Sequence, residues 1–441
     1  MTKNFIYGVA TAAYQIEGGY REDGKGDSIW DVFTHQQGNI KHGDNADIAC
    51  DHYHRYKEDV ALMVELGVKA YRFSVAWTRI LPNGDGEINQ KGIDFYNALI
   101  DELLKYGIEP YLTLYHWDLP QKLYERGGVM SPEMPKWFYD YTKVVAKAFG
   151  DRVKNFITIN EPQCILACFN GSGQAPNLKY SIKDRLTATH ILLKSHGMAV
   201  KALRETVKDV KIGYAPCGFV HCPKDTSEKE IEVARRAYFA IPQDDPTECV
   251  SIFSDPIFFG DYPKEYYKKF QDILPDIQAR DFELISQPID FYCQNIYFGA
   301  TGKEVNGEFI KDDYAGGSPR NTLGWNIYPQ AMYWGLKFLH ERYKMPIYIT
   351  ENGLANIDVV SLDGKVHDPQ RIDYIERYLR ALEQAQKDGV DVRGYFYWSL
   401  LDNFEWGNGY DPRFGLVYVD YVTQQRIPKD SFYYYKDRIK E

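Results

Sequence analysis

Short apolar runs alternate with amphipathic stretches along almost the whole chain. Eight runs are rich in β-branched and aromatic residues, which is the composition of buried strands. The stretches between them carry apolar residues at helical spacing, as Val60 and Met63 do before Gly67, a residue typical of helix ends. The predicted strands cover residues 5–13, 69–75, 110–115, 155–159, 211–215, 289–296, 347–350 and 392–398.

Helices are predicted between these strands and after the last one. Strict alternation of strands and helices implies a parallel sheet with helical crossovers. Eight such units match a closed α/β architecture, the (β/α)8 TIM barrel, which needs about 250 residues in its minimal form. The predicted helices are 53–66, 94–106, 132–150, 183–207, 329–343, 371–387 and one from about 430, with two more near 227–240 and 263–273 that flank a proline-rich turn region.

The chain has 441 residues, and no linker, repeat or low-complexity segment divides it. We therefore predict a single catalytic barrel domain over residues 1–441. The length beyond a minimal barrel falls mostly after strands, on the barrel face where active sites lie, so it should form the walls of a pocket. These predicted insertions cover residues 18–52, 117–132, 162–182, 217–262, 298–328 and 401–429.

Two of the predicted strands lead directly into a glutamate. Glu161 follows Asn160 at the end of the run 155–159, and Glu351 follows the run 347–350. A carboxylate beside a buried strand is costly unless it is paired or used. Two carboxylates at one barrel mouth can cleave a glycosidic bond, with retention when they are about 5 Å apart and inversion at about 6.5–9.5 Å. The sequence leaves this separation open.

Other polar residues stand at strand ends or in the loops that follow them. A nucleophilic carboxylate must stay ionised, and Arg72 and Tyr297 offer a charge and a hydrogen bond for this. The carboxyl group that acts as the acid should have no cation beside it. The remaining candidates, which offer polar groups for sugar hydroxyls or ring faces for a pyranose, are Asn160, Gln15, His116, Trp117, Gln163, Asn295, Glu405, Trp398 and Trp406.

Composition removes several classes of function. A net charge of −10 without any basic run excludes a nucleic-acid partner. No stretch of about 18 apolar residues and no signal peptide is found, so we expect a cytoplasmic protein without a membrane anchor. Seven cysteines without a paired CxxC spacing argue against a disulfide framework. Cys217, His221 and Cys222 lack a fourth ligand, and 51–54 (DHYH) is better explained as a helix start, so no metal or cofactor is predicted.

Six motifs in order give the chain a family resemblance. They are YQIEG at 14–18, YHW at 115–117, NEP at 160–162, TENG at 350–353, DNFEW at 402–406 and RFGL at 413–416. With them the chain resembles the family-one glycoside hydrolases, specifically bacterial β-glucosidases. The resemblance implies a retaining mechanism with Glu161 as acid/base and Glu351 as nucleophile, and it places Arg72 and Tyr297 beside the nucleophile. It further implies Trp325 on the leaving-group side and sugar binding by Gln15, His116, Asn160, Trp398, Glu405 and Trp406.

The same loop indicates which substrates to expect. Family members that act on phosphorylated glucosides carry Ser and Lys where this chain has Glu405 and Trp406, and an anionic Glu405 would repel phosphate. We therefore predict unphosphorylated β-D-glucosides or oligosaccharides as substrates, with β-galactosides and β-fucosides left open and a 6-phospho-β-glucosidase as the alternative. Gln163, the segment QAPN at 174–177 and Ile296 depart from the family pattern and predict an unusual, polar leaving-group pocket.

Two other classes of protein fit less well. A non-catalytic sugar-binding barrel would keep the aromatic residues and lose a carboxylate, whereas both Glu161 and Glu351 are present. A barrel oxidoreductase would need a glycine-rich dinucleotide fingerprint after a strand, and the chain has none.

Overall fold

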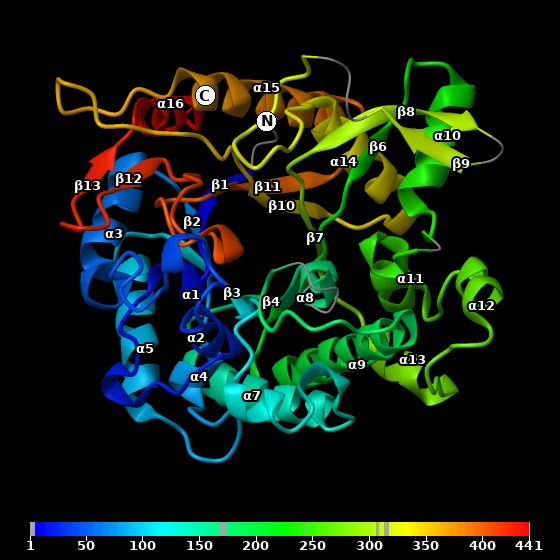
Figure 1. The fold of residues 1–441 in the computed structure, drawn as a ribbon, viewed down its shortest axis with the longest axis horizontal. Coiled ribbons are helices and arrows are strands. Elements are labelled where there is room, and N and C mark those ends of the chain that lie inside the picture. Colours follow the sequence, from blue (N-terminus) through cyan, green and yellow to red (C-terminus); the bar gives the residue numbers. More distant parts are fainter. Residues whose placement is uncertain (1–4, 168–172, 243, 306–307, 313–316, 441) are drawn as a thin grey trace.

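Eight parallel strands form a closed barrel at the centre of the protein (Figure 1). The computed structural model describes residues 5–440 except 168–172, 243, 306–307 and 313–316. The order around the barrel is β1-β11-β10-β7-β5-β4-β3-β2, so the predicted TIM barrel is confirmed. Its strands are β1 (Ile6–Ala10), β2 (Ala70–Ser74), β3 (Glu109–Tyr115), β4 (Asn155–Asn160), β5 (Lys211–Ala215), β7 (Phe291–Asn295), β10 (Ile347–Asn352) and β11 (Val392–Trp398).

Long helices surround the barrel and connect its strands, as Figure 1 shows. Their ends differ from the predicted ones by a few residues; the helix predicted from Asp94 begins at Gln90, for example. The long helices are α3 (His52–Leu66), α5 (Gln90–Lys105), α7 (Met134–Phe149), α9 (Ile182–Thr206), α14 (Gln330–Tyr343), α15 (Pro369–Lys387) and α16 (Asp430–Arg438). Shorter helices lie in the segments between them: α1 (Ala13–Ile16), α2 (Ile29–Thr34), α4 (Trp77–Ile80), α6 (Gln121–Tyr124) and α8 (Pro162–Ala167).

The first strand, β1, is shorter than the predicted run 5–13. The run 5–13 leaves the sheet after Thr11, whose N–H donates to the Arg72 carbonyl. The Ala13 N–H instead donates to Ser74 Oγ, and the chain turns into α1. Gln15 therefore lies on a short helix above the barrel rather than at a strand end.

In its described residues, the segment between β5 and β7 contains four α-helices, two more than predicted, and a short 3-10 helix at Pro246–Glu248. The α-helices are α10 (Glu228–Phe239), α11 (Ser251–Phe259), α12 (Lys264–Phe270) and α13 (Ala279–Ile285). One proline of the predicted proline-rich turn region, Pro256, lies inside α11. Its neighbours Ile252 and Phe253 are fully buried, and this packing outweighs the cost of a proline within a helix.

Two small sheets, which the sequence did not predict, are built from the segments after strands. A three-stranded sheet joins β6 (Val220–Cys222), β8 (Gly299–Val305) and β9 (Glu308–Lys311), and a hairpin joins β12 (Val417–Val419) and β13 (Arg426–Pro428). Within the described residues, no helix is long and apolar enough to cross a membrane.

Aromatic rings fill the barrel and leave its mouth to polar groups. The rings of Tyr111 and Phe396 lie 4.9 Å apart, and those of Phe291 and Tyr348 lie 5.0 Å apart. A glycine in a strand makes room for one of these rings: a Cβ added at Gly8 would meet Phe396 at 2.5 Å. A packed interior of this kind leaves the carboxyl ends of the strands as the place for an active site, and the candidate residues gather there.

Candidate active site

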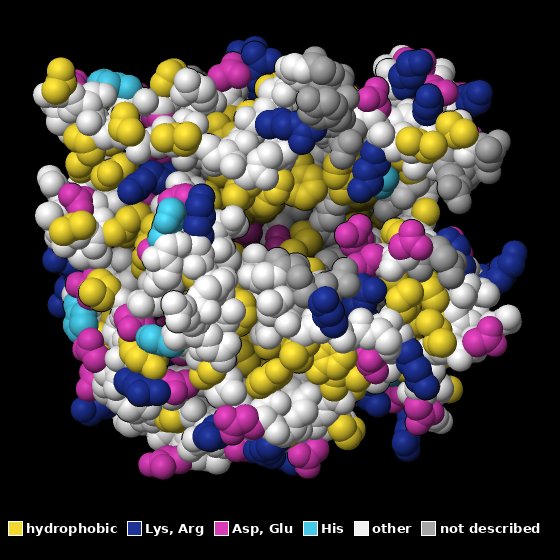
Figure 2. Space-filling view, viewed as in Figure 1, with side chains coloured by type: hydrophobic (Ala, Val, Ile, Leu, Met, Phe, Trp, Pro, Cys, Tyr) yellow, Lys and Arg dark blue, Asp and Glu magenta, His cyan; other side chains and the backbone are white. Residues whose placement is uncertain are grey.

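Glu161 and Glu351 line one pocket at the carboxyl ends of the barrel strands. Glu351 belongs to β10 and Glu161 follows β4 directly. The pocket has a volume of about 440 Å³ and also includes His116, Trp398 and Glu405 among its lining residues. Figure 2 shows the hollow near the middle of the face, with acidic side chains inside it. A larger hollow of about 780 Å³ over α12 and α13 is more open and lies away from these strand ends.

Glu351 is held by one hydrogen bond on each oxygen. Arg72 Nη1 donates to Oε1 at 2.5 Å, and the Tyr297 hydroxyl donates to Oε2 at 2.8 Å. Burial raises the pKa of Glu351 above its usual value, and the Arg72 charge and the bonds from Tyr297 and Arg72 offset only part of this rise. Because the Arg72 side chain is fully buried, solvent screens its charge on Glu351 very little. Arg72 and Tyr297 thus lie against the carboxylate where they were predicted.

Glu161 has an amide partner instead of a cation. Asn295 Nδ2 donates to Glu161 Oε1 at 2.7 Å, and the orientation of this amide is fixed because Asn295 Oδ1 accepts from the Thr350 hydroxyl at 2.7 Å. Burial, and then the negative charge of Glu351, raise the pKa of Glu161 to about 7. Within one pocket, therefore, one carboxyl group is paired with a cation and the other is suited to carry a proton near neutral pH.

The backbone around this pair is locally strained. Glu161 has a φ of 42°, and Trp117 and Trp406 have φ values of 75° and 51°. A non-glycine residue in this region costs about 1–3 kcal/mol, which packing elsewhere must offset. Gly353 is required for close packing of two strand ends. A Cβ there would lie 1.7 Å from the Trp398 carbonyl oxygen, so only glycine lets the ends of β10 and β11 approach this closely.

Asn160 orients the groups behind the two carboxylates. Its Oδ1 accepts from Arg72 Nη2 at 2.6 Å and from Asn295 Nδ2 at 3.1 Å, which directs its Nδ2 toward His116 Nε2 at 3.0 Å. Since the amide donates there, His116 Nε2 accepts and the ring proton lies on Nδ1. Burial, with a smaller contribution from the Arg72 charge, holds the pKa of His116 well below its usual value. His116 is therefore neutral, and its Nδ1–H has no partner among the described residues.

Gln15 and Glu405 lie together beside this histidine. Gln15 Nε2 donates to Asn403 Oδ1 and to the Phe404 carbonyl, both at 2.9 Å, and to Glu405 Oε2 at 3.3 Å. Gln15 Oε1 is buried and has no partner in the described part of the chain. Burial, then the charges of Glu351 and Glu161, raise the pKa of Glu405 to about 8. At neutral pH Glu405 is mostly protonated, so charge repulsion by this residue alone is a weaker barrier to phosphate than the sequence indicated.

Aromatic rings form the remaining walls of the pocket. Trp117 packs against Trp406 with ring centroids 4.6 Å apart, and its Nε1 donates to the Asn160 carbonyl at 3.1 Å. Trp398 lies 5.9 Å from the His116 ring, nearly parallel to it. On the other side, Trp325 lies 5.4 Å from Tyr297. The pocket thus offers flat apolar faces around a polar floor, as a site for a sugar ring requires.

Residues 1–441 match the family model described as glycosyl hydrolase family 1. The chain belongs to this family. It is 46% identical to beta-glucosidase A of Thermotoga maritima, with 99% of this chain and 97% of that protein covered. It is 39% identical to a bifunctional beta-D-glucosidase/beta-D-fucosidase of Bifidobacterium breve, over 98% and 97% of the two chains. The solved structure of beta-glucosidase from Thermotoga maritima in complex with glucoimidazole superimposes with a TM-score of 0.91 at 46% identity, covering 99% of this chain and 98% of that one.

Not every candidate residue faces the pocket of this family 1 protein. Arg72, Asn160 and Gln15 support residues that line it, and Gln163 lies outside the lining. The Gln163 amide donates from Nε2 to the Cys217 carbonyl at 2.9 Å and accepts from the Cys217 N–H at 3.3 Å. Whether Gln163 contributes to substrate binding stays a prediction. Ile296 is fully buried, and Gln174 lines the pocket.

Among the lining residues that sequence reasoning missed, two carry thiols, Cys164 and Cys217. Cys164 lies three residues beyond Glu161, and Cys217 lies two residues beyond the end of β5. A signal was present, because β4 and β5 are neighbours and residues just past parallel strand ends meet at the same edge. The sequence reasoning grouped Cys217 with His221 and Cys222 instead, and the described residues show no cluster of that composition.

Proposed function

We propose that this family 1 protein is a retaining β-glucosidase that removes unphosphorylated β-D-glucose from the non-reducing end of glycosides and oligosaccharides. Residues 1–441 act as one catalytic unit in this proposal. The observation that carries it is the contrast between two carboxyl groups in one pocket: Glu351 is paired with Arg72 and Tyr297, whereas Glu161 is paired with an amide and has a raised pKa.

In the first step Glu351 attacks the anomeric carbon and Glu161 protonates the departing oxygen. Arg72 offsets part of the effect of burial on Glu351 and so favours its ionised form, whereas Glu161 has no such cation and burial favours its protonated form. The products of this step are a glycosyl ester on Glu351 and the free leaving group. The two carboxyl groups are sufficient for this chemistry.

In the second step Glu161 becomes the base that activates water. The glycosyl ester on Glu351 carries no charge, so one of the two causes that raise the pKa of Glu161 is removed. The pKa of Glu161 falls at the stage when this residue must accept a proton. Attack of water on the ester then releases β-glucose and restores the charge on Glu351, which in turn favours a protonated Glu161 for the next cycle.

We assign the binding of the sugar ring to pocket residues with polar atoms that lack partners among the described residues. His116 Nδ1–H donates to a hydroxyl oxygen, while Gln15 acts through Glu405, to which its Nε2 donates at 3.3 Å. Glu405, protonated or ionised, binds a further hydroxyl, and the Trp398 face stacks on the ring. In this proposal the leaving group contacts Trp325, whose ring centroid lies 5.4 Å from that of Tyr297. The bifunctional relative makes β-fucosides a reasonable second substrate class for this chain.

The phosphorylated-glucoside alternative lacks support in the pocket. A phosphate dianion requires cationic partners, and the described residues that line the pocket include neither Lys nor Arg. Instead they include Glu161, Glu351 and Glu405. This argument holds whether or not Glu405 is protonated, and it replaces the simpler argument from Glu405 repulsion.

We further propose that the protein acts in the cytoplasm. A reducing compartment would keep the thiols of Cys164 and Cys217, which lie 3.7 Å apart, in their reduced form.

The experiment that tests the function combines substrate choice with stereochemistry. The protein is given matched aryl β-glucoside, β-galactoside and 6-phospho-β-glucoside, and proton NMR follows the first anomer released from the best of them. We expect the β-glucoside to be hydrolysed fastest, with β-glucose appearing before α-glucose. If α-glucose is released first, the enzyme inverts and the double displacement is wrong, and if the phosphorylated substrate is preferred, the proposed substrate class is wrong.

A further inference from the structure

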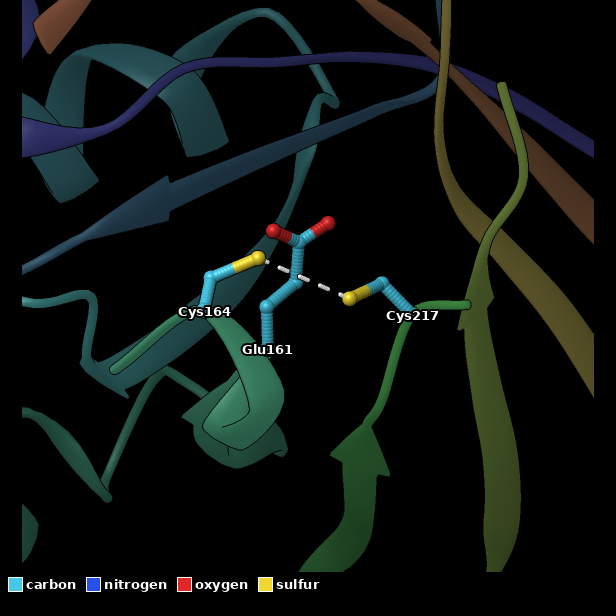
Figure 3. Close-up of side chains that lie close together, drawn as sticks. All are labelled: Glu161, Cys164 and Cys217. Atoms are coloured by element: carbon cyan, nitrogen blue, oxygen red, sulfur yellow. Dashed lines mark hydrogen bonds between the residues drawn. The ribbon is translucent and has the colours of Figure 1, made fainter. Parts of the chain in front are cut away.

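Two thiols stand beside Glu161 in the wall of the pocket, as Figure 3 shows. Cys164 comes from α8 and Cys217 from the segment that follows β5. Their Sγ atoms are 3.7 Å apart, and a Glu161 carboxylate oxygen and both sulfurs all lie within 4.8 Å of one another. Among the described residues, no other three His, Cys, Asp or Glu side chains bring donor atoms so close together.

The spacing of the sulfurs matches a shared metal ion. A Zn–S bond is about 2.3 Å long, so two thiolates on a tetrahedral zinc are about 3.7–3.8 Å apart. The observed separation is 3.7 Å. A disulfide would need the sulfurs at about 2.0 Å. The pair is therefore spaced for a common cation, with the Glu161 carboxylate as third ligand and the pocket open to supply a fourth, such as water.

Gln163 fixes the relative position of the two sulfur-bearing segments. It precedes Cys164 on α8, and its side-chain amide forms two hydrogen bonds with the backbone of Cys217. This reciprocal pair joins α8 to the segment after β5. Gln163 is thus a positioning residue, and it reduces the rearrangement that binding of a cation would otherwise require.

We propose that Glu161, Cys164 and Cys217 bind a thiophilic divalent cation, Zn²⁺ in the first place, and that the bound cation blocks hydrolysis by taking the Glu161 carboxylate. Soft thiolates with one carboxylate favour zinc over magnesium or calcium. Binding displaces the thiol protons and any proton on Glu161 into solvent. A coordinated Glu161 can then neither protonate the leaving group nor accept a proton from water. The inhibition rests on the proposed function, whereas the binding does not.

Binding is tested by optical titration of the full chain with Co²⁺ under anaerobic conditions. Cobalt bound to thiolates absorbs in the near ultraviolet through sulfur-to-metal charge transfer. We expect this band to saturate at one equivalent and to vanish when Zn²⁺ is added. C164S and C217S should each weaken binding by about 100-fold or more, since even residues behind a metal ligand contribute about 10–100-fold.

C222S is the matched control for these two variants. Cys222 is a buried thiol in β6, five residues beyond Cys217 and outside the proposed ligand set. We expect C222S to bind Co²⁺ as tightly as the unaltered chain, and circular dichroism checks that every variant is folded. Absence of the band in the unaltered chain, its persistence in C217S, or its loss in folded C222S would each overturn the site.

Inhibition is measured separately with an aryl β-glucoside. We expect Zn²⁺ to inhibit the unaltered enzyme, a chelator to restore activity, and C217S to need about 100-fold more Zn²⁺ for the same inhibition. Activity that returns with a thiol reductant and not with a chelator would mean that the thiols are oxidised, and it would overturn the inhibitory site. If the chain hydrolysed no glucoside at all, the proposed function would fail while the cobalt titration would still decide whether the cation binds.

Discussion

The ends of β4 and β10 place the same side chain in opposite electrostatic surroundings. At the end of β10, Glu351 contacts a buried guanidinium and a hydroxyl, both of which stabilise its charge. After β4, Glu161 contacts the Asn295 amide, and burial together with the negative charge of Glu351 raises its pKa to about 7. The two roles, nucleophile and acid, thus follow from the neighbours that the barrel provides and not from any difference between the glutamates themselves.

The hydrogen-bond network keeps the two environments apart. Arg72 donates to Glu351 and Asn160, while Asn295 donates to Glu161 and to the same Asn160 oxygen. Asn160 therefore lies between the cation and the amide and contacts both. The following changes alter one side of this contrast at a time.

The largest effect is expected from Glu351→Gly. Removing the nucleophile should lower kcat for an aryl β-glucoside by about 10⁴–10⁶-fold, as loss of a nucleophile does in other covalent mechanisms. Added azide can occupy the vacated space and attack the anomeric carbon directly, so the product should be the α-glucosyl azide. Proton NMR of the product measures this outcome. Undiminished turnover in the variant would contradict the assignment of Glu351.

Glu161→Ala should give a smaller loss and the opposite product. General acid catalysis contributes about 10²–10⁴-fold, and the loss should be greatest for substrates whose leaving group is a poor one. With an activated aryl glucoside the glycosyl ester still forms, and azide should release it as the β-glucosyl azide. The two variants therefore separate the roles by product configuration. An α-azide from Glu161→Ala would mean that Glu351 does not form an ester.

The sequence predicted those parts of the active site that depend on the pattern of residues in a single strand. It did not predict those that depend on tertiary packing. The barrel, the two glutamates, Arg72 and Tyr297 were predicted because each lies in or at the end of an apolar run whose direction is fixed by the parallel sheet. Gln15 was predicted at the end of a strand and lies on α1, because β1 ends at Ala10 and the Ala13 N–H bonds to the Ser74 side chain instead of continuing the sheet. Helix α11 was missed because burial outweighed its proline.

The contact between Cys164 and Cys217 was not predicted, because these residues are far apart in the sequence and belong to no common motif. Cys217 was compared with its neighbours in the sequence. The thiol that it contacts, that of Cys164, lies on α8, which follows β4, the strand next to β5 in the barrel. Gln163 was assigned to the pocket from its place after NEP, yet its side chain bonds to the Cys217 backbone. Side-chain direction at a strand end depends on tertiary partners, which residue types and spacing do not reveal.

Tyr297→Phe removes one of the two hydrogen bonds to Glu351 and leaves both carboxyl groups in place. The hydroxyl donates to Glu351 at 2.8 Å, and a hydrogen bond to a charged group contributes about 1.5–3 kcal/mol, so kcat/KM should fall by roughly 10–150-fold. This bond also lowers the pKa of Glu351. Without it the acid limb of the pH–rate profile should move to higher pH. Tyr433→Phe, at an exposed tyrosine of α16, is the control, and an equal loss there would point to a general effect of the substitution.

The smallest expected effect is a fall in the pKa of Glu161 in a Glu351→Gln variant. Activity should fall as pH rises through about 7, where Glu161 loses the proton it must donate. Part of this raised pKa comes from the negative charge of Glu351, and the glutamine removes that charge while it keeps the shape of the side chain. The pKa of Glu161 should therefore fall. It should remain above the usual glutamate value, because burial is the larger cause and is unchanged in the variant.

Carbon NMR of ¹³C-labelled glutamate carboxyl groups measures this pKa directly, without turnover. Glu161→Gln in the same background identifies the signal, since it removes only that resonance. A pKa that does not change on loss of the Glu351 charge would mean that burial alone protonates Glu161. Formation of the glycosyl ester would then give Glu161 no tendency to become a base, and the change of role between the two steps would need another cause.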